Sequence, residues 1–99
     1  MIYVIATATI KKESRDAFIA GAKKVVAETV KEKGCISYDL CASVTDPEKL
    51  CFVERWETLE DLAAHAKAPH IGPWRELSAD MKISPTVIEV ISNASVEVR

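Results

Sequence analysis

The chain has 99 residues, of which 48% are hydrophobic and 28% are charged, and its formal net charge is −2. This length favours one domain over residues 1–99, and the composition is typical of a folded globular protein rather than of a disordered one. The lack of any block of basic residues argues against nucleic-acid binding, and no apolar run approaches the roughly 18 residues that a membrane-spanning helix needs.

The first third of the chain predicts a strand followed by a helix. Residues 2–10 are β-branched and small, without glycine or proline, which is typical of a strand. Residues 14–33 change to helical spacing, with Ser14 as the expected N-cap and an apolar side that begins at Phe18. Gly34 follows at the place where a left-handed residue closes many helices.

The middle of the chain predicts a β-hairpin. Residues 35–44 alternate between polar and apolar side chains, and residues 49–56 return after a turn that contains Pro47. The side chains expected on one face of the returning strand are Leu50, Phe52, Glu54 and Trp56.

The last third predicts a second helix and a fourth strand. Thr58 and Asp61 have the spacing of a capping box, so a helix is expected from residue 59 to about residue 67, before Pro69. Residues 70–82 are expected to be looser, with at most one or two helical turns. Residues 86–91 are expected to form the fourth strand, and the polar tail could lengthen it.

The order of these elements is βαββαβ, which predicts an α+β fold with a four-stranded antiparallel sheet and both helices on one face. Strands one, three and four carry apolar residues on both faces, so one sheet face would stay uncovered in a monomer. A ligand pocket or a second subunit must cover this face. We expect a homodimer whose sheets face each other.

The three cysteines, Cys35, Cys41 and Cys51, contain no Cys-x-x-Cys pair, which argues against zinc-ribbon and thioredoxin signatures. Cys41 and Cys51 could pair across the hairpin, but an odd number of cysteines suits a reducing compartment. The N-terminus also lacks the pattern of a secretory signal. We therefore expect a cytoplasmic protein in which all three thiols are small buried apolar groups.

The two histidines, His65 and His70, are not expected to bind a metal together. Five residues correspond to about 140° around a helix, and Pro69 interrupts the helix between them. His65 could face a pocket and transfer a proton near neutral pH, or it could be a solvated or capping residue. Both interpretations stay open from the residues alone.

The two tryptophans, Trp56 and Trp74, could pack in the core or form a flat wall for a planar ligand. Glu54 lies on the same strand face as Trp56, and a carboxylate on an apolar face is costly unless it is paired or functional. An ion pair of Glu54 with Arg75, with Arg15 or with a partner-chain lysine is an equally open interpretation.

Three short motifs follow one another along nearly the whole chain, in an order and spacing that resemble the antibiotic-biosynthesis monooxygenase family. They are Gly34-Cys35-Ile36-Ser37-Tyr38, Phe52-Val53-Glu54-Arg55-Trp56, and His65 with Pro69-His70. The resemblance implies a ferredoxin-like fold, a homodimer that forms a dimeric α/β barrel, and a pocket between the sheet and its helices. It also implies oxidation of a quinol-like or polycyclic aromatic substrate by O₂ without a cofactor.

This chemistry needs no metal or organic cofactor, because a dihydroxy-aromatic substrate is itself the reductant once a base has removed a proton from it. By its position in the motif, His65 is the expected catalytic base. The residues expected to bind the small aromatic substrate are Trp56, Phe52, Glu54, Tyr38, His70 and Trp74.

Other branches of the same fold give alternative functions. Haem degradation is disfavoured because residues 1–92 contain no asparagine, His65 stands near the position of that branch's tryptophan, and Trp74-Arg75 occupies the region of its axial histidine. Isomerisation of a small signalling molecule and non-catalytic ligand binding both stay open.

Overall fold

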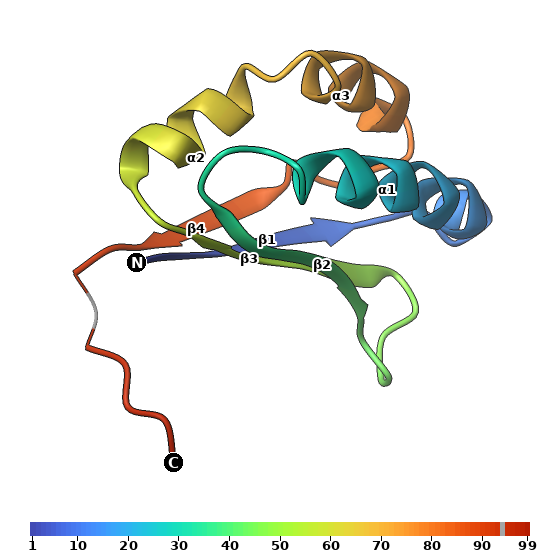
Figure 1. Cartoon of the computed structure of the whole chain (residues 1–99). Helices are drawn as coiled ribbons and strands as arrows, with labels where there is room; N and C mark the ends of the chain where they lie inside the picture. The colour runs from blue at the N-terminus through green and yellow to red at the C-terminus, as the bar shows by residue number, and fades with distance from the viewer. Residues whose placement is uncertain (94) are drawn as a thin grey trace.

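The computed structural model describes residues 1–93 and 95–99, and it has the predicted α+β, ferredoxin-like architecture. Figure 1 shows a single sheet with all of its α-helices on one face. The strands are β1 (Ile2–Thr9), β2 (Cys35–Ala42), β3 (Lys49–Trp56) and β4 (Val87–Ile91). The helices are the short 3₁₀ helix η1 (Lys12–Ser14) and the α-helices α1 (Arg15–Thr29), α2 (Leu59–Ala66) and α3 (Ile71–Ala79).

The sheet is antiparallel throughout, with the strand order β2-β3-β1-β4. Along β1, the even-numbered residues from Ile2 to Ala8 are buried under the helices, as the alternation of the sequence predicts. Glu54 lies opposite Val4 on β1 and opposite Tyr38 on β2. The register therefore brings these three side chains to the face that the helices cover.

Helix α1 begins one residue later than predicted and ends earlier, at Thr29. Ser14 is the N-cap residue, but its side chain makes no capping hydrogen bond, because the preceding η1 gives it helical rather than extended dihedral angles. Gly34 has the expected left-handed conformation, with φ of 80°. A Cβ atom at Gly34 would also collide with the side chain of Asp61, so the chain needs glycine here for both reasons.

Strand β2 differs from the predicted alternation at its start. A register shift between Cys35 and Ser37 interrupts the pairing with β3. Ile36 is exposed, although the sequence pattern groups it with the buried Tyr38. A bulge of this kind adds one residue to a strand, which moves the side chains before it out of phase.

The segment after α2 contains a helix that is longer than the sequence predicts. Residues 71–79 form α3, a helix of 9 residues, whereas the sequence predicts a looser segment over 70–82 with one or two helical turns. Pro73 is the third residue of α3, and the backbone N–H groups of the first helical turn have no partner inside the helix. A proline at this position therefore does not interrupt the helix.

The helices leave β4 largely uncovered on the inner face. Ile88 and Val90, which pair with the buried Ala6 and Val4, are 62% and 47% exposed. The outer sheet face is uncovered as well, with Ile5 on β1, Val53 on β3 and other apolar side chains open to solvent. The outer face is the surface for which the sequence analysis expects a second subunit.

The predicted burial of all three thiols is wrong. Cys41 is exposed, and Cys35 and Cys51 are half-buried. Cys41 and Cys51 lie opposite each other in the register of β2 and β3, and all three cysteines are free. Their alternation places both residues on the outer face of the sheet, which the helices do not cover.

The tail does not lengthen β4 as the sequence pattern allowed, because residues 95–99 contain no strand; residue 94 lies outside the described residues. Over the described range, none of the helices is long and apolar enough to cross a membrane.

Candidate functional site

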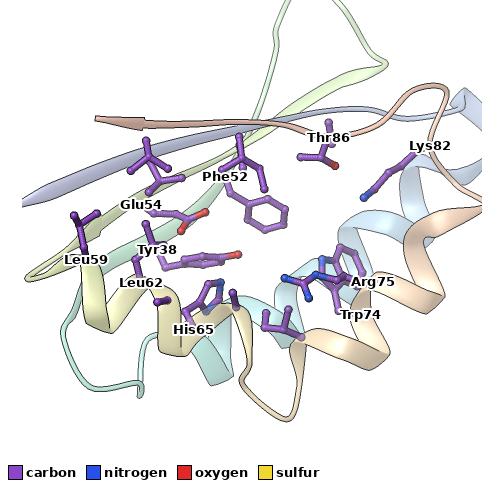
Figure 2. A pocket seen from close by; sticks show the side chains of 18 of the residues that line it. Tyr38, Phe52, Glu54, Leu59, Leu62, His65, Trp74, Arg75, Lys82 and Thr86 are labelled. Atoms are coloured by element: carbon purple, nitrogen blue, oxygen red, sulfur yellow. The ribbon is translucent and has the colours of Figure 1, made fainter. Parts of the chain in front are cut away.

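A cavity of about 430 Å³ lies between the inner face of the sheet and helices α2 and α3. All four strands contribute to it, and Figure 2 shows the side chains of both helices facing those of the sheet across the cavity. Most of the lining is apolar, and the polar side chains are few, which is the usual character of a small-molecule site. The polar lining residues are Tyr38, Glu54, His65, Arg75, Lys82 and Thr86.

Small side chains on β1 and the spacing of the helices make room for this cavity. Ala6 and Ala8 form part of its floor, at positions where neighbouring strands carry larger side chains. Leu62 and His65 line it from α2, as expected from their spacing of three residues. On α3, Trp74 lines the cavity and packs against Phe18, with 5.0 Å between the ring centroids.

Trp56 does not line the cavity, although it shares the inner sheet face with Glu54. Its side chain is fully buried, and it is absent from the lining that the described residues form. The indole Nε1 donates a hydrogen bond of 2.9 Å to Oε1 of Glu54. Trp56 therefore supports Glu54, and the core-packing interpretation of this tryptophan fits better than the wall.

Glu54 is a buried carboxyl group without a cationic partner. It is 4% exposed, and the ion pairs of the described residues include none with Arg75, Arg15 or a lysine. Burial raises the pKa of Glu54 from 4.5 to about 7, while the hydrogen bond from Trp56 opposes this shift. A carboxyl group with this pKa can both accept and release a proton near neutral pH.

The Glu54 pKa predicts a specific dependence of stability on pH. Between about pH 4.5 and about pH 7 the folded state binds more protons at Glu54 than the unfolded state does, so the free energy of unfolding falls as the pH rises. We expect Glu54→Gln to remove this fall and to be more stable than the wild type at pH 8, by about 2–3 kcal/mol. Denaturant titrations of both proteins from pH 4 to pH 8 test this, and parallel stability curves would contradict it.

Tyr38 belongs to a group of neighbouring rings that also includes Phe52 and His65. Its ring centroid lies 5.3 Å from Phe52 and 5.3 Å from the imidazole of His65. Burial and the nearby Glu54 raise the pKa of the Tyr38 hydroxyl well above its ordinary value of 10. Tyr38 is therefore a neutral hydroxyl group at physiological pH and can donate a hydrogen bond in the cavity.

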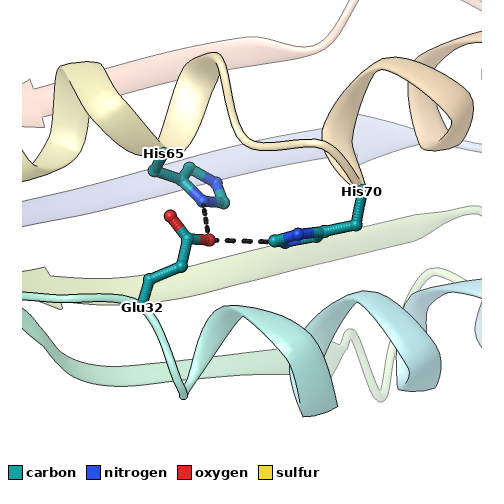
Figure 3. Close-up of side chains that lie close together, drawn as sticks. All are labelled: Glu32, His65 and His70. Carbon is teal, nitrogen blue, oxygen red and sulfur yellow. Dashed lines mark hydrogen bonds and ion pairs between the residues drawn. The ribbon is translucent and has the colours of Figure 1, made fainter.

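His65 is held in place by a carboxylate that sequence reasoning missed. Its Nδ1 lies 2.7 Å from Oε2 of Glu32, a residue of the turn after α1 (Figure 3). Because an ionised carboxylate only accepts, Nδ1 is assigned as the donor of this hydrogen bond. Nε2 of His65 has no hydrogen-bond partner among the described residues. Every buried polar side-chain atom of these residues does have a partner, so Nε2 is not buried and is accessible.

His65 is buried and packs against neighbouring aromatic rings. It is 9% exposed, and its ring lies 4.9 Å from that of Trp56. Truncation of His65 to alanine would open a space between two aromatic rings and is expected to lower the stability of the protein.

His70 lies behind His65, on the far side of Glu32. Its Nε2 is 3.3 Å from Oε2 of Glu32 and 2.9 Å from Oγ1 of the buried Thr29. His70 lines a second cavity, of about 350 Å³, and is absent from the lining of the main one. The structure thus does not place His70 where the resemblance predicts a contact with substrate.

The two histidines meet even though their spacing argues against it. Residues 67–70 form a short connection that turns the chain between α2 and α3, so the two rings do not belong to one continuous helix. The ligand atoms of Glu32, His65 and His70 all lie within 4.8 Å of one another. This is the group of described residues that could hold a divalent metal ion, and two imidazoles with one carboxylate suit transition metals.

Five of the seven predicted site residues line the main cavity: Tyr38, Phe52, Glu54, His65 and Trp74. Sequence reasoning missed Glu32, which stands in a charged run typical of a solvated turn. It also missed the contribution of Arg75 and Lys82 to the cavity, because both belong to the segment that was predicted to be loose.

Comparison with known proteins agrees with this geometry. A model of the family described as antibiotic biosynthesis monooxygenase matches residues 1–77. The curated protein YgiN of Escherichia coli K12, described as a "Probable quinol monooxygenase", is 31% identical over 70 residues, covering 63% of this chain and 67% of YgiN. The uncharacterised protein sll1783 of Synechocystis is 26% identical over 97% of this chain, which spans 65% of that protein.

Solved structures show the same fold. The structure of Rv0793 from Mycobacterium tuberculosis superposes with a TM-score of 0.90 and 26% sequence identity, covering 98% of both chains. Together with the family match over residues 1–77, this places the chain in the antibiotic biosynthesis monooxygenase family. The resemblance inferred from the motifs is confirmed at the level of family and fold.

Proposed function

We propose that the chain is a cofactor-independent monooxygenase that oxidises a quinol-like or polycyclic aromatic substrate with O₂. The observation that carries this proposal is the accessible imidazole of His65 on the wall of an apolar cavity, fixed by Glu32 at 2.7 Å. A histidine whose Nδ1 is tied to a carboxylate presents Nε2 as a proton acceptor, which is the orientation that general-base catalysis needs.

In the proposed reaction His65 removes a proton from a phenolic or activated C–H group, and the resulting anion transfers an electron to O₂. Recombination at carbon gives a hydroperoxide. Loss of water from it converts a CH₂ group to a carbonyl, so that one oxygen atom stays in the product and the other leaves as water. Tyr38 and Glu54 supply a neutral hydroxyl and a carboxyl with a pKa of about 7 beside the substrate. Both can orient its oxygen atoms.

Consumption of O₂ with a dihydroxynaphthalene or an anthrone tests this proposal directly. We expect substrate-dependent O₂ uptake by protein freed of metal with a chelator, because the substrate supplies the electrons. An oxygen electrode and mass spectrometry of the product measure uptake and incorporation from ¹⁸O₂. Activity that disappears with the chelator and returns with a metal ion would contradict the cofactor-independent mechanism.

Glu32→Gln tests the specific role of the Glu32 carboxylate beside His65, as distinct from the general effect of removing one negative charge. Glutamine cannot fix Nδ1–H of His65 in the same way, and loss of such a supporting partner typically costs about 10–100-fold in activity. Glu28→Gln is the matched control, because Glu28 is an exposed residue of α1 that forms an ion pair with the exposed Lys31 and none with His65 or His70 among the described residues. Equal rates for both variants would contradict the proposed role of Glu32.

An isomerase is the second candidate, and one observation favours it. Glu54 and His65 line the same cavity, and a carboxyl group with a pKa of about 7 beside an imidazole suits a proton shift between neighbouring atoms of a substrate. Incubation of a hydroxyketone in D₂O without O₂ distinguishes the two functions. Exchange of carbon-bound hydrogen for deuterium in this incubation, together with no O₂ uptake in a separate assay under air, would favour the isomerase.

We also propose that the protein is a homodimer, because apolar side chains of β1, β3 and β4 are exposed on the outer sheet face. They include Ile5, Val53, Val87 and Ile91. Burying such a face stabilises a dimer by about 25 cal/mol for each Å² of apolar surface. Analytical ultracentrifugation at low micromolar concentration is expected to show twice the 10.9 kDa mass of the chain, and Val53→Glu is expected to shift the equilibrium toward monomer. A folded wild-type species of monomer mass would contradict the proposal.

A further inference from the structure

Two cationic side chains line the end of the main cavity that lies away from His65. Arg75 belongs to α3, and Lys82 follows that helix, where its backbone forms a β-bridge with Ile10. Figure 2 shows both side chains directing their nitrogen atoms toward the cavity, with Phe52 between them and Glu54.

These two cations have no acidic partner in the part of the chain that the structure describes. None of its ion pairs involves Arg75 or Lys82. Lys82 is half-buried, and burial together with the nearby Arg75 lowers the pKa of its ammonium group. Arg75 is exposed, so the desolvation concerns Lys82 alone. An anion bound by both side chains would relieve the desolvation of Lys82 and the repulsion between the two charges.

The cavity is therefore chemically divided along its length. One end offers Glu54, Tyr38 and His65, which suit a hydroxyl group. The middle is aromatic and apolar, and the other end offers Thr86 with the two cations. A ligand that carries complementary groups at its two ends would be held in one orientation only, which is how an enzyme brings a reacting atom to its base.

We propose that the cavity binds an aromatic compound with a hydroxyl group at one end and an anionic group, a carboxylate or a phosphate, at the other, and that Arg75 and Lys82 bind the anionic group. The placement of the hydroxyl end at His65 rests on the proposed function. The recognition of the anion does not, because it requires binding and no turnover.

Calorimetric titration without O₂ tests the anion site with a matched pair of ligands. 6-Hydroxy-2-naphthoate and 2-naphthol share the ring and the hydroxyl group, and the naphthoate adds a carboxylate at the opposite end of the ring system. We expect the naphthoate to bind about tenfold or more tightly, the usual effect of charge-assisted hydrogen bonds to a partly buried cation. 6-Hydroxy-2-naphthyl phosphate forms a third arm, and the tighter of the two anions identifies the preferred group.

Lys82→Met and Arg75→Met connect this preference to the two cations. Each is expected to reduce the preference for the naphthoate severalfold and the double variant to abolish it, while the affinity for 2-naphthol changes less than twofold. Lys24→Met is the matched control, because Lys24 is an exposed lysine of α1 outside the cavity, and it should keep the full preference.

The outcomes separate the anion site from the oxidation reaction. Equal affinity of the wild type for 6-hydroxy-2-naphthoate and 2-naphthol, or an unchanged preference in the double variant, would overturn the anion site. A preference that depends on Arg75 and Lys82 in a protein that consumes no O₂ would support the anion site and contradict the proposed oxidation.

Discussion

His65→Gln is expected to lower the turnover of a good quinol substrate by about 10²–10⁴-fold, the usual contribution of a general base. Glutamine nearly fills the space of the imidazole between Trp56 and Tyr38, and its amide can still donate to Glu32. The variant therefore removes the proton acceptor while it keeps most of the packing. Steady-state O₂ uptake from pH 6 to pH 8 measures the effect.

Two further measurements make the His65 result specific. Binding of the substrate without O₂ should change by less than threefold in His65→Gln, because the loss concerns the chemical step. His65→Ala should be equally inactive and also less stable, since it leaves a space beside two aromatic rings. Turnover of His65→Gln at the wild-type rate would remove His65 from the mechanism.

Trp56→Ala is expected to give the largest loss of stability, about 3–5 kcal/mol for truncation of a buried tryptophan. The side chain is fully buried, on the same sheet face as Glu54. Its removal also leaves the carboxyl of Glu54 without its donor, and an unpartnered buried polar group costs about 1–3 kcal/mol. Guanidinium titration monitored by circular dichroism measures the free energy of unfolding.

Trp56→Phe separates these two contributions. Phenylalanine keeps most of the buried ring but cannot donate to Glu54, so the loss should be smaller than for alanine. In a double-mutant cycle with Glu54→Met, which removes the acceptor, the coupling between Trp56 and Glu54 should be measurable, since the two are joined by a hydrogen bond of 2.9 Å. A loss below about 1 kcal/mol for Trp56→Ala would contradict the supporting role of this residue.

The alternation of the strands predicted where Phe52, Glu54 and Tyr38 lie, because a period of two residues fixes which face of a sheet a side chain occupies. It could not show that Phe52 lines the cavity and that Trp56 does not. Both residues share one face, and the difference depends on where α2 and α3 cross that face. The position of a helix over a sheet is set by packing between distant segments, which periodicity does not record.

The Glu32–His65–His70 group was inaccessible to sequence reasoning for a different reason. Glu32 follows α1 and the histidines flank the connection between α2 and α3, so the three meet only when two turns distant in the sequence pack side by side (Figure 3). The rule that histidines five residues apart diverge holds for a continuous helix. Here the helix ends at Ala66, and the rule does not apply.

The uncovered inner side of β4 has a kinetic consequence. Ile88 and Val90 both line the main cavity and are about half exposed, so the cavity opens to solvent along this strand. A ligand can enter there without the opening of a loop, a step that takes microseconds to milliseconds in enzymes with a lid. Association should therefore follow a single exponential whose rate rises linearly with ligand concentration, and the lifetime of the complex should depend on the contacts inside the cavity alone.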